Sequence, residues 1–135
     1  MRIRVSIVED NRGTRESLTE LLTRAPALRF VNAHPSGEEA LQQIPTDAPD
    51  VVLMDINLPR MNGIECVAQL KQRAPKTQVL MLTTYEEGDL IFDSLRKGAS
   101  GYLLKNMPPA ELVQAIEQVH AGGAPMSMQI ARKVV

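Results

Sequence analysis

Val51-Val52-Leu53-Met54-Asp55 is the stretch that decides the fold, a run of four aliphatic residues that ends in an acid. Successive side chains of a strand point to opposite faces of its sheet, so a run that is apolar at every position needs both faces covered. Such a run suits the middle of a parallel sheet with helices on each side. The Asn62-Gly63 pair that follows marks a turn.

Strand-like and helix-like segments alternate along the whole chain. Short β-rich runs predict five strands, at 3–8, 28–33, 51–54, 79–82 and 101–104. Apolar residues at helical spacing predict five helices, at 12–25, 37–44, 64–73, 89–97 and 110–120. The second helix is expected to stop before Pro45. This alternation is typical of an α/β domain with one parallel sheet.

The length and the net charge of the chain limit the kinds of protein it can be. The 135 residues, 44% of them hydrophobic, suit a single domain, expected over 1–121. Residues 122–135 predict a linker or the start of a further helix. A net charge of −1 argues against direct binding to nucleic acid or to a membrane surface. No apolar run approaches a membrane span, and Cys66 stands alone, so we expect a cytoplasmic protein.

Chemically active residues recur where the predicted strands end. Open parallel sheets bind ligands at the carboxyl ends of their strands. A sheet order of 2-1-3-4-5 would make the first, third, fourth and fifth strands neighbours. Their ends would then place three carboxylates, one hydroxyl and one ammonium at one edge of the sheet, from Glu9, Asp10, Asp55, Thr83 and Lys105.

Three crowded carboxylates repel one another, and a divalent cation resolves the conflict. Mg2+ suits the site because it accepts one or two carboxylates and keeps room for a phosphoryl oxygen. We expect Asp10 and Asp55 as direct ligands, the backbone carbonyl of Asn57 as a third, and Glu9 acting through water.

Phosphoryl transfer to a carboxylate is the reaction that such a site favours. Asp55 is the candidate nucleophile, since carboxylates form acyl phosphates. Lys105 supplies a compact positive charge and Thr83 a hydroxyl for the phosphoryl oxygens. Taken singly each residue has a plainer interpretation, because acids at strand ends cap helices, lysines face water, and Cys66 is a small half-buried residue. The combination at four strand ends is what carries the prediction.

Four stretches of this chain resemble the receiver domains of two-component response regulators, over residues 3–121. They are Ile7-Val8-Glu9-Asp10-Asn11, 52–59 with Asn62-Gly63, Met81-Leu82-Thr83, and 98–105. The resemblance implies a flavodoxin-like (CheY-like) doubly wound sheet of order 2-1-3-4-5 with five helices. It also implies Mg2+-dependent transfer from a phosphohistidine of a sensor histidine kinase to Asp55. In receiver domains a hydroxyl group moves toward the phosphoryl group, and an aromatic ring moves into the space behind it. Thr83 matches the residue with the hydroxyl, and Tyr102 matches the aromatic residue.

The end of the chain resembles the subclass (NarL/FixJ-type) whose receiver precedes a LuxR-type helix-turn-helix. The resemblance implies transcription regulation through a DNA-binding part that this sequence does not contain. It implies no enzyme activity beyond the domain's own phosphorylation and dephosphorylation. Two homodimer faces remain open, either the fourth helix, fifth strand and fifth helix, or the first and fifth helices.

The sequence departs from the family pattern near the candidate site. Asn106 follows Lys105 where many receivers have proline, which leaves open whether that peptide bond is cis. Thr84 and Tyr85 are bulkier than the small residues often found beside the hydroxyl. They are predicted to restrict the access of water to this edge of the sheet and so to lengthen the lifetime of a phosphoryl group.

Other functions on the same fold fit less well. A phosphatase with an aspartyl nucleophile would need a second acid two residues later, where Asn57 stands. If the chain were a phosphorylation-independent interaction module, we would expect one of the acids or the lysine to be replaced by another residue type. All of them are present. A flavin carrier would need a phosphate cradle in the first loop, which is acidic here.

Overall fold

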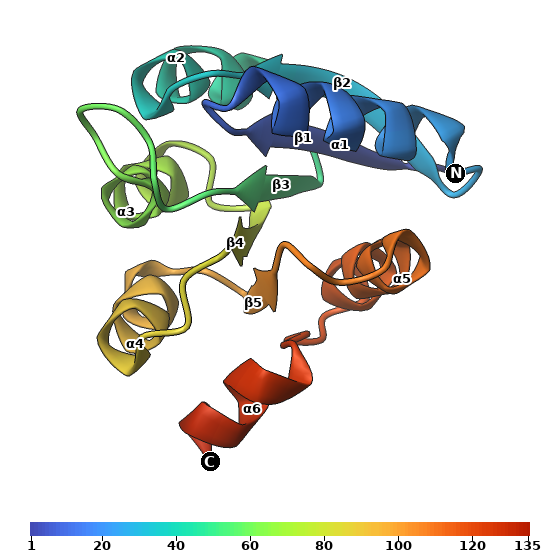
Figure 1. Cartoon of the computed structure of the whole chain (residues 1–135). Coiled ribbons are helices and arrows are strands. Elements are labelled where there is room, and N and C mark those ends of the chain that lie inside the picture. The colour runs from blue at the N-terminus through green and yellow to red at the C-terminus, as the bar shows by residue number, and fades with distance from the viewer.

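The computed structural model describes residues 1–135. Its five parallel strands form one sheet in the order β2-β1-β3-β4-β5 (Figure 1). The strands are β1 Ile3–Val8, β2 Leu28–His34, β3 Val51–Met54, β4 Gln78–Thr83 and β5 Gly101–Leu104. The helices are α1 Arg12–Arg24, α2 Gly37–Asp47, α3 Gly63–Arg73, α4 Gly88–Lys97, α5 Pro109–His120 and α6 Met128–Val134. The predicted sheet order is confirmed.

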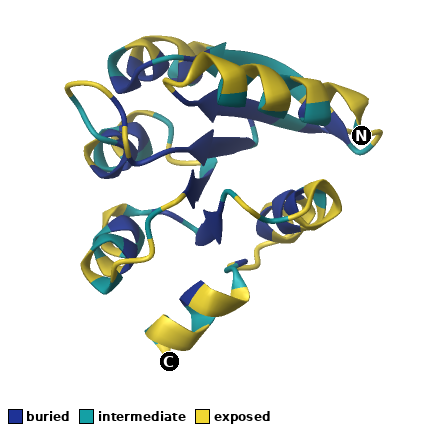
Figure 2. Ribbon diagram, in the orientation of Figure 1, coloured by how far each residue is buried: buried dark blue, intermediate teal, exposed yellow.

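Each face of the sheet carries its own aliphatic core. Val51 and Leu53 of β3 pack in a cluster with residues of α1 and α5. Val52 and Met54 point the other way, into a cluster with residues of α2, α3 and α4. All four side chains are at most 1% exposed, and Figure 2 shows the buried sheet between helices whose outer sides are exposed. The wholly apolar third strand is therefore explained by burial on both faces.

The register of the sheet brings the functional strand ends level with one another. Val8 pairs with Met54, and Met54 pairs with Met81. Thr83 pairs with Leu104. The residues that follow β1, β3 and β5 therefore start at the same edge, which is called the rim below.

The second helix does not stop at Ile44. It continues through Pro45 to Asp47 and ends at Ala48, whose backbone is left-handed with φ 48°. A proline costs most in the middle of a helix, because it removes one hydrogen bond and crowds the preceding turn. Pro45 lies in the last turn, where the Ala48 N–H still bonds to the Ile44 carbonyl at 2.8 Å.

The expectation of five helices is also wrong, since residues 128–134 complete a sixth. Before it, the chain runs beside β5: the Tyr102 N–H donates to the Pro125 carbonyl at 3.1 Å, and the Ser127 N–H donates to the Tyr102 carbonyl at 3.2 Å. Ile130 of α6 is fully buried in the cluster that contains α4. We call residues 124–134 the C-terminal strap. The segment is ordered because it covers the edge of β5 and buries one aliphatic side chain.

Two further points follow from the backbone. Every peptide bond is trans, including the bond between Lys105 and Asn106. None of the helices has both the length and the apolar character that crossing a membrane requires.

Candidate functional site

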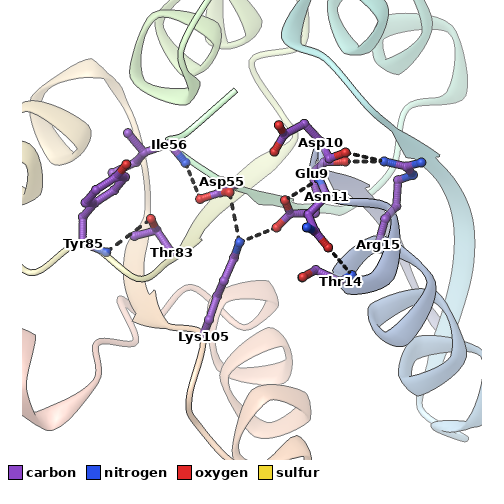
Figure 3. Close-up of polar contacts among 10 residues, drawn as sticks. All are labelled: Glu9, Asp10, Asn11, Thr14, Arg15, Asp55, Ile56, Thr83, Tyr85 and Lys105. Carbon is purple, nitrogen blue, oxygen red and sulfur yellow. Dashed lines mark hydrogen bonds and ion pairs between the residues drawn. The ribbon is translucent and has the colours of Figure 1, made fainter. Parts of the chain in front are cut away.

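Three acids meet at the rim, where β1 and β3 end. Oxygen atoms of Glu9, Asp10 and Asp55 all lie within 4.8 Å of one another (Figure 3). Glu9 and Asp55 are buried, at 2% and 5% exposed, while Asp10 faces solvent. The Asp55 N–H donates to the Val8 carbonyl at 3.1 Å, so the sheet itself ties the two loops together.

Lys105 closes the group from the end of β5. Its Nζ lies 2.5 Å from Glu9 Oε1 and 3.0 Å from Asp55 Oδ2. Burial alone would lower the pKa of this ammonium, but its hydrogen bonds to Glu9 and Asp55 outweigh burial and raise the pKa. Burial raises the pKa of Glu9 against the opposing effect of Lys105. The lysine therefore stays charged and holds two acids in place.

The donor set fits a divalent cation. Three carboxylates and one ammonium leave two net negative charges at the rim. Ligand oxygens about 2.1 Å from one Mg2+ lie at most about 4.2 Å apart, so the acids need only a small movement to share an ion. The Asn57 carbonyl accepts no hydrogen bond and Asn57 is exposed, which leaves this oxygen free to be a ligand. The predicted ligand set remains a prediction.

Thr83 and Tyr102 are linked by the loop after β4 rather than by direct contact. Thr83 is buried, and its hydroxyl oxygen accepts the Tyr85 N–H at 3.5 Å. The Tyr102 ring is fully buried, and its hydroxyl donates to the Tyr85 carbonyl at 2.9 Å. Burial raises the pKa of this phenol well above its usual value. No hydrogen bond joins Thr83 to Asp55, so the hydroxyl has to turn before it meets a group bound there.

The two bulky residues after Thr83 differ in position. Thr84 is exposed and lines a small cavity of about 110 Å3 together with Lys105 and Asn106. Tyr85 is half-buried and packs against the core cluster of α4. The predicted restriction of water at the rim by Thr84 and Tyr85 stays a prediction.

Arg15 is a residue of the site that the sequence did not single out. Its Nη1 donates to the Glu9 carbonyl at 2.9 Å and to the Asp10 carbonyl at 3.1 Å (Figure 3). Asn11 caps the same helix by accepting the Thr14 N–H at 2.9 Å. Arg15 therefore fixes the backbone that carries both acids. Helical spacing places it on α1, but no sequence signal says that it reaches back to these carbonyls.

Comparison with known proteins bears directly on this site. The family model of the response regulator receiver domain matches residues 5–117. The chain belongs to this family. The predicted receiver fold and family resemblance are confirmed. Receiver domains generally bind Mg2+ and act with sensor kinases, and the acidic cluster at the rim is consistent with that metal.

The curated relatives are transcription regulators. The chain is 36% identical to the transcriptional regulatory protein LnrK of Bacillus subtilis, over 98% of this chain and 60% of that protein. It is 34% identical to DegU of Brevibacillus brevis, over 99% of this chain and 57% of that protein. The chain thus spans about three-fifths of the length of these relatives.

A solved structure extends the likeness to the end of the chain. A LuxR-family two-component response regulator from Aurantimonas sp. SI85-9A1 superposes with a TM-score of 0.93 at 34% identity. The match covers 99% of this chain and 96% of that chain. The predicted LuxR-type subclass is therefore supported by sequence and by structure.

Proposed function

We propose that this receiver domain accepts a phosphoryl group on Asp55 from the phosphohistidine of a sensor histidine kinase, with Mg2+ bound at the rim. The resulting change is passed to a DNA-binding output that lies outside this chain. The observation that carries the proposal is the single cluster of Glu9, Asp10, Asp55 and Lys105 at the ends of β1, β3 and β5.

The residues divide the reaction between them. A carboxylate oxygen of Asp55 forms the new O–P bond as the N–P bond of the phosphohistidine breaks, and the imidazole keeps the electron pair and takes a proton. Bound Mg2+ would neutralise the charge that gathers on the transferred oxygens. Asp55 is held for attack because its Oδ1 accepts the Ile56 N–H at 2.8 Å and its Oδ2 accepts from Lys105.

Lys105 and Thr83 stabilise the product. Lys105 already touches Asp55, so its ammonium reaches the added phosphoryl oxygens with a small shift. Thr83 gives up only a long hydrogen bond from Tyr85 when its hydroxyl turns to donate to the same oxygens. No second carboxyl group stands two residues after Asp55, where Asn57 lies, so we propose no turnover of other substrates.

The groove between α1 and α5 is the proposed kinase surface. It has a volume of about 550 Å3, opens at Lys105 and Asn11, and continues past Leu18, Leu21 and Leu112. A phosphohistidine must approach Asp55 from the rim, and this apolar groove reaches that rim. Both expected homodimer faces, the one at α4, β5 and α5 and the one at α1 and α5, stay predictions, and the C-terminal strap lies along β5 and beside α4 in the first of them.

Incubation with Mg2+ and acetyl phosphate tests the proposal. We expect the intact protein to gain one phosphate mass, and Asp55→Ala to gain none. Asp89→Ala, which removes an exposed acid of α4, is the matched control and should label normally. An unlabelled, folded wild-type protein would overturn the proposal, and steady release of phosphate beyond one equivalent would favour an enzyme.

A further inference from the structure

The C-terminal strap is bonded to β5 on both sides of the switch residue Tyr102. The Tyr102 N–H and carbonyl both pair with strap residues, Pro125 and Ser127. The Ser127 Oγ also accepts the Leu104 N–H at 3.0 Å, one residue before Lys105. The strap therefore holds the strand from which the rim lysine projects.

A second set of contacts joins the strap to the loop after β4. Lys133 of α6 donates to the Glu86 carbonyl at 2.6 Å. The neighbouring residue Tyr85 accepts from the Tyr102 hydroxyl and donates to the Thr83 hydroxyl oxygen. Lys105 thus directly follows a residue, Leu104, that is bonded to the strap. Thr83 is bonded to Tyr85, whose neighbour Glu86 is bonded to the strap. These are the two residues that would meet a phosphoryl group.

The strap fits this surface closely. A Cβ atom on Gly101 would lie 2.3 Å from the Pro125 carbonyl oxygen, so the strap sits against β5 only because a glycine stands there. Ile130 is fully buried and anchors α6 beside α4. A turn of exposed residues, 121–123, with Gly122 at φ 99°, connects the strap to α5. The strap therefore meets the rest of the domain at β5, at α4 and at the loop after β4, and it is joined to α5 by this one exposed turn.

We propose that docking of the C-terminal strap on α4 and β5 is coupled to the state of Asp55, so that a phosphoryl group tightens the strap and the strap in turn favours the phosphoryl group. This inference rests on the proposed function. An added phosphoryl group gives Thr83 and Lys105 a common partner and so orders the ends of β4 and β5, to which the strap is bonded. Coupling between two binding events is reciprocal, with typical factors of about 5 to 150.

Hydrogen exchange on the full chain tests the first half of the coupling. The strap amides of residues 127–131 are followed with Mg2+, with and without beryllofluoride as the phosphoryl mimic. We expect exchange in the strap to slow at least about fivefold on addition of the mimic. Asp55→Ala should show no such change. Unchanged or faster exchange in a wild-type protein that binds the mimic overturns the inference.

The reverse half uses a pair of neighbouring variants in α6. Ile130→Asn places a polar group in the buried anchor site, whereas Gln129→Asn changes an exposed residue of the same helix. We expect the affinity for beryllofluoride to fall at least about fivefold in Ile130→Asn and to stay within twofold in Gln129→Asn. Equal affinities overturn the coupling while leaving phosphorylation of Asp55 intact. Failure of the wild-type protein to bind the mimic at all would instead overturn the proposed function.

Discussion

The two sides of β5 differ in how much of the surface is covered. One side carries α1 and α5, and the other carries α4 and the C-terminal strap. On one side, Leu21 and Val113 line a groove between α1 and α5 and are only half-buried. On the other, the C-terminal strap folds back along β5, where Pro125 is buried, and Ile130 is buried beside α4. The first side keeps an apolar groove, whereas on the second side the edge of β5 is covered, with Phe92 of α4 and Met128 of α6 exposed beside it. The difference shows that a short terminal segment can cover the edge strand of a receiver while the groove on the other side stays open.

The largest effect expected from this difference is on stability. Ile130→Ala removes a buried anchor and should lower the free energy of unfolding by about 2 kcal/mol or more. Leu21→Ala trims a half-buried side chain of the open groove and should cost less than about 1 kcal/mol. Urea unfolding monitored by circular dichroism measures both. Equal losses would mean that the strap contributes no more than a surface residue does.

A pair of glycines tests how closely the covered side is packed. A Cβ on Gly101 would meet the Pro125 carbonyl oxygen at 2.3 Å and Leu80 Cδ2 at 2.7 Å, so Gly101→Ala should cost about 1–3 kcal/mol. Gly88 at the start of α4 has nothing within 4 Å of the added atom. Gly88→Ala should therefore leave stability unchanged or raise it by up to about 1 kcal/mol. Similar losses in the two variants would contradict the close contact of strap and strand.

The open side contributes to the metal site through Arg15. Arg15→Ala should weaken Mg2+ binding about tenfold, because the carbonyls of Glu9 and Asp10 lose the group that positions them. Arg12→Ala removes the same charge three residues earlier, where the side chain pairs only with exposed Glu16, and should change affinity less than twofold. Isothermal titration calorimetry measures both affinities. If the two variants behave alike, Arg15 acts only by its charge.

The smallest effect concerns the phenol buried on the covered side. Burial raises the pKa of Tyr102 above its usual 10, so the unfolded chain ionises first and stability that is present below pH 10 is lost as pH rises beyond it. Between pH 9 and pH 11 the free energy of unfolding should fall by about 1 kcal/mol more in wild type than in Tyr102→Phe. Parallel losses in the two proteins would show that the hydroxyl is not held in the folded state.

Local sequence patterns predicted most of the fold and the acids of the site. The unbroken apolar run of β3 required two covered faces, and the alternation of elements required parallel strands. Because parallel strands end at one edge, the rim residues Glu9, Asp10, Asp55 and Lys105 came together as expected. The end of α2 was misplaced since Pro45 is tolerated in a last turn, which its position in the chain does not reveal.

The sequence could not predict the contacts of residues that act on parts of the chain far from them. Arg15 looks like any other charged residue of an amphipathic helix, and only the turn of the chain after β1 brings two carbonyls within its reach. Tyr102 matched the family aromatic, but its full burial depends on Tyr85 and on the strap that closes β5.

The sequence by itself determined the α/β class and the acids and amine at the strand ends, because periodicity and strand ends are properties of neighbouring residues, and the strand order came from the resemblance to receiver domains. Only the tertiary structure decided that residues 124–134 dock on β5 and α4 and that the groove at α1 and α5 stays open. The physical reason is that docking depends on the fit of Ile130 and Pro125 to surfaces formed by residues far from them in the chain. A fit of this kind exists only once those surfaces have been assembled.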